Sequence, residues 1–134
     1  MNGLIFHIAA RDVWNAAQKA GQYAAPSLTT DGFIHCSKLT QVLPVAEKFY
    51  RGQTGLILLA IDPTRLSSGL KWESPFDGAP PVGKTPAPSS GVSASEMFPH
   101  IYGPVNLDAV VQVFDFEPTV DGEFILPTVL LSGN

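Results

Sequence analysis

Asp31-Gly32-Phe33-Ile34-His35-Cys36-Ser37 is typical of a glycine turn that opens into a short strand. Alternation along a strand places Phe33, His35 and Ser37 on one face and the two residues between them on the other. A histidine and a hydroxyl therefore share a face with an aromatic ring, as in a small polar site in an apolar wall. A core histidine with a hydrogen-bond partner would give the same pattern, so this stretch alone leaves both interpretations open.

The composition predicts one globular domain spanning residues 1–134, with a core of its own. Hydrophobic residues make up 45% of the chain and charged residues 15%, which is the balance of a folded protein. Twelve glycines and twelve prolines indicate many turns and argue against a helical bundle. With a net charge of −4 the chain lacks the basic footprint that duplex DNA requires, although a small anion pocket stays possible.

The cysteine content and the lengths of the apolar runs indicate where in the cell the protein is expected. Cys36 is the single cysteine, so no intramolecular disulfide can form and a cytoplasmic location is expected. The first residues lack the basic and apolar regions of a signal peptide. The longest apolar run, Leu56 to Ile61, is too short to cross a bilayer, so we expect no membrane partner.

Periodicity predicts that the chain begins strand, helix, loop, strand, helix. The first strand is expected over Leu4 to Ile8, with His7 and Ile5 on one face. Its helix is expected over Arg11 to Ala20, with Gly21 as the stop. Gln22 to Thr30 reads as a loop before the central strand. A second helix is expected over Gln41 to Tyr50, with Thr40 as N-cap and with Val42, Val45, Ala46 and Phe49 facing the core.

The second half of the chain is predicted to be mostly strands. Leu56 to Ile61 is a continuous apolar run, as in a strand buried on both faces. Further strands are expected over Leu70 to Glu73, over Phe98 to Tyr102 with Pro99 at an edge or irregular position, over Val110 to Phe116, and over Phe124 to Leu126 after a turn at Val120 to Glu123. The proline-rich segment 74–95 is expected to be a surface loop, either a lid or an inert insertion.

The three histidines all lie inside strand-like apolar segments. Each of His7, His35 and His100 alone has a structural explanation, but together they suggest a shared pocket. Three histidines can ligate zinc, yet the usual short metal spacings are missing, and we expect no metal site. Cys36 alternates with apolar Ile34 and is expected to be a buried, unreactive thiol. No glycine-rich phosphate loop is present in the sequence.

Several motifs together resemble a known family. They are Phe6-His7-Ile8, Trp14, Gly21-Gln22-Tyr23, Ser27-Leu28, Asp31 to Ser37, Gln41, Trp72-Glu73, Phe98 to Pro104, and Asp108-Ala109-Val110-Val111. From about Ile5 to Pro127 the chain resembles the bacterial family called domain of unknown function 952. Gly-Phe-Ile-His-Cys-Ser and Phe-Pro-His-Ile-Tyr-Gly are the longest and most specific of these motifs.

The resemblance implies the α+β fold of the ADP-ribosyltransferases, in which NAD lies in a cleft between two small packed sheets. His7 matches the first-strand residue that holds an NAD ribose, and His35 with Ser37 matches the second motif. This histidine pair is most similar to that of the tRNA 2′-phosphotransferases. Candidates for the third catalytic position are Glu73, Glu96 and His100, while Tyr23 and Tyr102 are candidates to stack on a nucleotide ring.

These observations predict an ADP-ribosyltransferase-like domain that binds NAD or a related small nucleotide in a histidine-lined cleft, and that transfers ADP-ribose as a further step. One alternative is a non-catalytic module that binds a small ligand on the same fold. A second is a zinc-dependent hydrolase that uses the three histidines. The acceptor of any transfer is not specified by the sequence.

Overall fold

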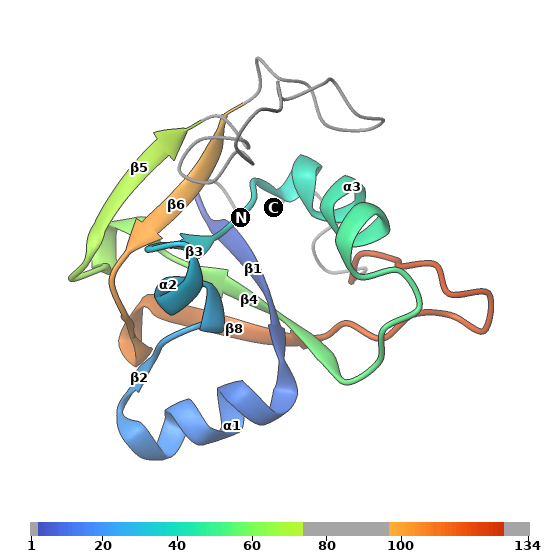
Figure 1. The fold of residues 1–134 in the computed structure, drawn as a ribbon, viewed down its shortest axis with the longest axis horizontal. Coiled ribbons are helices and arrows are strands. Elements are labelled where there is room, and N and C mark those ends of the chain that lie inside the picture. The colour runs from blue at the N-terminus through green and yellow to red at the C-terminus, as the bar shows by residue number, and fades with distance from the viewer. Residues whose placement is uncertain (1–2, 74–96, 128–134) are drawn as a thin grey trace.

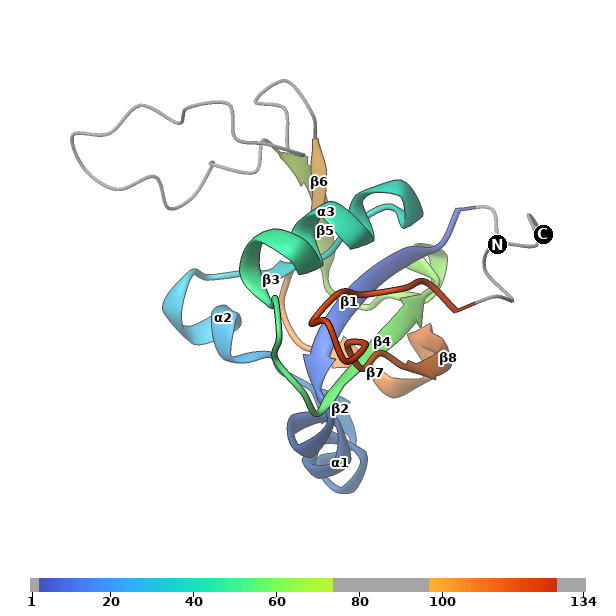
Figure 2. The same ribbon diagram turned by 90° about the vertical axis from the view of Figure 1, so that its right-hand side faces the viewer.

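The computed structural model describes residues 3–73 and 97–127. Over these residues two three-stranded antiparallel sheets, a two-stranded ribbon and three α-helices make a mixed α+β fold (Figures 1 and 2). The prediction of an α+β protein with small sheets is thus confirmed. The described residues contain no helix that is both long and apolar enough to span a membrane.

The first sheet has the order β1-β4-β8. It comprises β1 (Ile5–Ala10), β4 (Leu56–Ile61) and β8 (Val110–Asp115), all paired antiparallel. Every residue of the central strand β4 is buried, as predicted from its unbroken apolar run. Alternate residues of β4 enter two different core clusters, one on each face of the sheet, so both faces are covered.

The second sheet has the order β3-β6-β5 and comprises β3 (Ile34–His35), β6 (Phe98–Tyr102) and β5 (Gly69–Glu73). Its central strand contains Pro99, so the expectation of an edge or irregular position for this proline is wrong. The carbonyl oxygen of Pro99 accepts from the Cys36 amide at 3.0 Å, which places its missing N–H on the same side. Because proline has no N–H, this residue pair lacks its second hydrogen bond, to the Cys36 carbonyl, and β3 ends at His35.

The two sheets share one core cluster and are joined by one backbone bridge. Phe6 in β1 and Ser37 just after β3 exchange two amide hydrogen bonds of 2.7 Å each. Ile34 and Ile101 of the second sheet pack with Ile57 and Leu59 of the first. The inner face of the second sheet is therefore fixed in the core, and alternate side chains of its strands point to the opposite face.

Helix α1 (Arg11–Ala20) has the bounds that the sequence predicts. It buries Trp14 and Ala17 against the core, whereas Ala20, three residues after Ala17, is exposed. Gly21 ends the helix in the left-handed region, at φ 90°, and its amide donates to the Ala17 carbonyl at 2.9 Å. A glycine is needed here because other residues adopt this conformation only with strain.

The variant Gly21→Ala is expected to lower the free energy of unfolding by about 1–2 kcal/mol, through backbone strain alone. A Cβ atom at this position would meet no atom within 4 Å, so steric overlap adds nothing. Gly69→Ala is the matched control, because Gly69 also has open space but no positive φ. Urea unfolding should show this control unchanged or slightly stabilised; equal losses in the two variants would refute the explanation.

Helix α3 (Leu39–Phe49) begins earlier than predicted, and its N-cap is Lys38 rather than Thr40. The Lys38 amide donates to the side-chain oxygen of Gln41 at 2.8 Å, so a glutamine three residues into the helix caps it in place of a hydroxyl. Val42 and Ala46 are fully buried, as predicted. Phe49 is 63% exposed, so its assignment to the core is wrong.

Several connections differ from the sequence prediction. Gln22 to Thr30 is not a loop: it contains β2 (Gln22–Tyr23), which pairs with β7 (Val105–Asn106), and helix α2 (Pro26–Thr30). The turn after Thr119 is present, but the expected return strand Phe124–Leu126 is absent, and Phe124 instead stacks on Phe116. Short 3-10 turns occupy Pro63–Arg65 and Leu107–Ala109. The predicted loop 74–95 and the candidate Glu96 lie outside the described residues.

Candidate functional site

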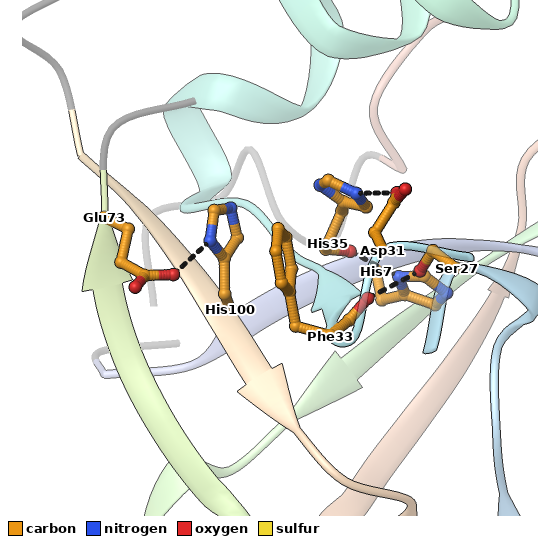
Figure 3. A network of polar contacts seen from close by, with 7 residues as sticks. All are labelled: His7, Ser27, Asp31, Phe33, His35, Glu73 and His100. Carbon is orange, nitrogen blue, oxygen red and sulfur yellow. Dashed lines mark hydrogen bonds and ion pairs between the residues drawn. The ribbon is translucent and has the colours of Figure 1, made fainter. Parts of the chain in front are cut away.

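One face of the second sheet gathers most of the predicted site residues that the structure describes. We call it the histidine face, made of Phe33, His35, Glu73, His100 and Tyr102. His35 and His100 are directly paired across β3 and β6, and their rings are 5.3 Å apart. Figure 3 shows the two histidines on either side of the Phe33 ring, each with its own carboxylate partner.

The exposed histidine is paired with an aspartate. The side chain of His35 is 48% exposed, and its Nε2–H donates to Oδ2 of Asp31 at 2.8 Å. Asp31 lies directly after α2, at the turn that leads into β3. Since the carboxylate accepts from Nε2, the neutral ring keeps Nδ1 as an acceptor. A solvent-exposed imidazole oriented in this way can exchange hydrogen bonds with a ligand that reaches the face.

The buried histidine is paired with a glutamate. His100 is 1% exposed, and its Nδ1–H donates to Oε1 of Glu73 at 2.8 Å. The hydroxyl of Tyr102 donates to the same oxygen at 2.7 Å. The hydrogen bond from Tyr102, followed by that from His100, lowers the pKa of Glu73 below its ordinary value. This part of the face therefore holds a fixed negative charge.

Phe33 sets the spacing between the two pairs. Its ring stacks on His100, with centroids 4.2 Å apart and an angle of 21°, and meets His35 edge-on at 4.7 Å. The Tyr102 ring lies 5.2 Å away on the same side. Phe33 is itself only 1% exposed. The histidine face is thus a packed group of rings in which a buried phenylalanine supports the polar side chains.

His7 belongs to the core beneath this face. It is 6% exposed; its Nδ1–H donates to the His35 carbonyl at 2.6 Å, and the Tyr23 hydroxyl donates to its Nε2 at 2.7 Å. Burial lowers the pKa of His7 to about 4, and burial raises the pKa of Tyr23 above its ordinary value. His7 is therefore neutral at physiological pH, with its proton on Nδ1.

The backbone of the histidine motif is held along its outer edge by two side chains. Ile34 and Cys36 face β6 in the hydrogen-bonded register, so the carbonyls of Phe33 and His35 point to the other side. Ser27 Oγ donates to the Phe33 carbonyl at 2.9 Å, and His7 donates to that of His35. Although β3 is only two residues long, side chains replace the neighbouring strand that it lacks.

The structure brings His35, His100, Glu73 and Tyr102 together and separates the other candidates from them. Tyr23 is 1% exposed and reaches His7 from the core. Ser37 is buried, and its backbone forms the bridge to Phe6. Cys36 is buried, as predicted, and burial raises the pKa of its thiol. Glu96 is outside the described residues.

Two residues of the site were missed from the sequence. Asp31 was interpreted only as a turn residue, although its place four residues before His35 was visible in the same motif. Lys71 pairs with His100 across β5 and β6, and its ammonium lies 4.9 Å from the centre of the Tyr102 ring. Alternation along Leu70 to Glu73 places Lys71 on the face of Glu73, which was the available signal.

Among the residues that the structure describes, no three or more His, Cys, Asp or Glu side chains form a group that could hold a metal ion. His7 is directed at Tyr23 and at the backbone, so the three histidines do not converge on one point. The zinc-hydrolase hypothesis consequently has no support in the described geometry.

Comparison with protein families matches residues 8–113 to the model described as Protein of unknown function (DUF952). The chain belongs to this family. The family prediction is thereby confirmed over most of the chain, and the matched region includes both histidine motifs of the face. No curated protein matches the DUF952 chain.

Solved structures of protein CC0527 from Caulobacter crescentus are similar to the DUF952 chain. The crystal structure is 32% identical, covers 96% of this chain and 98% of that one, and gives a TM-score of 0.74. A double mutant of it gives the same TM-score at 31% identity. The solution NMR structure is 33% identical, covers 90% of each chain and gives a TM-score of 0.66. The likeness supports the fold described above.

Proposed function

We propose that the DUF952 chain binds NAD or a related small nucleotide at the histidine face, and that ADP-ribose transfer is a further capacity of this site. The observation that carries the proposal is the arrangement of two histidine–carboxylate pairs, Asp31–His35 and Glu73–His100, with ring centroids 5.3 Å apart. The resemblance to ADP-ribosyltransferases supplies the ligand class.

The polar groups of the face suit a nucleotide. His35 is exposed and can exchange hydrogen bonds with ribose hydroxyls or phosphate oxygens. Tyr102 is 37% exposed, so part of its ring can stack on a base or on nicotinamide. The ammonium of Lys71, next to Tyr102, provides positive charge for a phosphate. Each of these groups lies on the same face of the second sheet.

The same face has a group suited to the transfer step. When nicotinamide leaves NAD, the ribose carbon takes on positive charge in an oxocarbenium-like transition state. Glu73 remains ionised because two donors lower its pKa, and a fixed carboxylate stabilises such a charge. His35 can accept the proton of an attacking hydroxyl, provided that the acceptor substrate places it within hydrogen-bond reach.

The variant His35→Ala is expected to weaken NAD binding at least tenfold while the protein stays folded. Hydrogen bonds to charged groups contribute about 1.5–3 kcal/mol, and 1.4 kcal/mol corresponds to a factor of ten. Isothermal titration calorimetry measures the affinity, and a thermal melt checks the fold. Asp31→Asn, which removes the carboxylate partner of His35, should weaken binding in the same direction.

Asp115→Asn is the matched control for Asp31→Asn. It also removes one carboxylate from an ion pair, that with Arg11 at 2.8 Å, but on β8 in the other sheet. Its affinity for NAD should equal that of the wild type. Unchanged affinity in folded His35→Ala protein, or equal losses in both aspartate variants, would refute the assignment of the site.

A non-catalytic binding module is the second candidate, and the position of His7 favours it. The residue that would hold an NAD ribose by resemblance is buried, with both ring nitrogens engaged by Tyr23 and by the His35 carbonyl. A module of this kind would bind NAD without consuming it. Release of free nicotinamide above a no-protein control would argue for the transferase, and binding without release for the module.

A further inference from the structure

His7 links the core of the first sheet to His35. Of the two histidines on the histidine face, His35 is the substantially exposed one. The chain of hydrogen bonds runs from the Tyr23 hydroxyl through the His7 ring to the His35 carbonyl, with lengths of 2.7 and 2.6 Å. At the far end, the His35 ring is bonded to Asp31. Trp14 packs 6.1 Å from Tyr23 and closes the buried end of this chain.

We propose that His7 is a positioning residue, which aligns the exposed His35–Asp31 pair by holding the His35 backbone, rather than a group that contacts the ligand. A two-residue strand gives its backbone few partners, and the outward His35 carbonyl would otherwise have none from a neighbouring strand. Tyr23 fixes the proton of His7 on Nδ1 by donating to Nε2. The expected effect of His7 on NAD affinity rests on the function proposed above.

Two substitutions distinguish the roles of the two ring nitrogens of His7. In His7→Asn, the amide nitrogen takes roughly the place of Nδ1 and can still donate to the His35 carbonyl, while Tyr23 loses its acceptor. In His7→Gln, the amide takes roughly the place of Nε2, so the acceptor for Tyr23 is kept and the donor to His35 is lost. The glutamine fills the core volume better than the asparagine, so a purely structural role predicts that His7→Asn is the more harmful variant.

Nuclear magnetic resonance tests the proposal through ring contacts that do not depend on NAD. Overhauser effects between Phe33 and His35, and between His35 and His100, should persist in His7→Asn and be lost in His7→Gln. NAD affinity should stay within about threefold of wild type in His7→Asn and fall at least tenfold in His7→Gln. Equal behaviour of the two variants in the ring contacts would overturn the proposal.

The wild-type protein provides a second test that does not depend on a folded variant. Long-range proton–nitrogen spectra should show His7 protonated on Nδ1 alone, as its partners require. A His7 ring protonated on Nε2 alone, or an Overhauser effect between that ring and the ribose of bound NAD, would overturn the positioning role. If NAD does not bind the wild type, the proposed function fails, while the ring contacts and the tautomer still decide the role of His7.

Discussion

Replacing Phe33 with alanine is expected to lower the free energy of unfolding by about 3–5 kcal/mol, the usual range for a fully buried phenylalanine. Phe33 is 1% exposed and contacts the rings of His35, His100 and Tyr102. Its removal takes away buried apolar area and leaves a cavity beneath the histidine face. Domains of this size are stable by about 5–15 kcal/mol, so the loss is a large share of the total.

Phe49→Ala is the matched control for this experiment. The same chemical change is made at a residue that is 63% exposed, on helix α3, and it should alter stability by no more than about 0.5 kcal/mol. Urea unfolding of both variants at pH 7 gives the comparison, and the melting temperature of Phe33→Ala should fall by on the order of ten degrees. A loss below about 1 kcal/mol in Phe33→Ala would show that this ring does not support the face.

Acidification is expected to destabilise the protein through His7, by about 2 kcal/mol between pH 7 and pH 5 and by about 3 kcal/mol once the pH falls below 4. Burial lowers the pKa of His7 to about 4, from an ordinary value near 6.5. Between these values the unfolded chain binds a proton that the folded protein does not bind. Stability therefore rises with pH across this window and is fully regained above pH 6.5.

His7→Asn provides the comparison for the acid effect, because asparagine does not titrate. Free energies of unfolding measured in urea at pH 7 and pH 5 should differ by about 2 kcal/mol less in the variant than in the wild type. Carboxylates remain mostly ionised at pH 5, so the lowered pKa of Glu73 contributes mainly below this range. Parallel losses in the two proteins would show that His7 does not titrate as a buried neutral ring.

The elements that were predicted well are those whose signals are local. Arg11 to Ala20 has helical periodicity and a glycine stop, and the structure gives the helix these same bounds. Leu56 to Ile61 has no polar residue, and it is the central strand of the first sheet. In both segments the local pattern and the tertiary environment favour the same structure, so the sequence alone was sufficient.

The elements that were predicted poorly depend on partners far away in the sequence. Gln22–Tyr23 is a strand only because Val105–Asn106 pairs with it. Pro99 lies in a central strand, where its carbonyl accepts from the Cys36 amide although its own amide proton is missing. Thr40 is not the N-cap of helix α3, because the Gln41 side chain caps the helix by accepting from the Lys38 amide. Such outcomes follow from tertiary contacts that a local pattern does not contain.

For the candidate site, the sequence predicted the residue types better than their environments. Alternation correctly put Phe33 and His35 on one face of their strand, and the structure places His100 and Tyr102 on the same face of the second sheet. It did not indicate that His35 is exposed while His7 and His100 are buried. Exposure depends on what covers each strand, so the three histidines, which look equivalent in sequence, have different surroundings.

The most direct test of the proposed nucleotide site is a titration of isotope-labelled protein with NAD, followed by nuclear magnetic resonance. The histidine face predicts that the largest signal changes cluster at Ile34 to Cys36 and at His100 to Tyr102, with smaller changes near Glu73. The absence of changes at millimolar NAD, or changes confined to β8 and the rest of the first sheet, would contradict the assignment of nucleotide binding to this face.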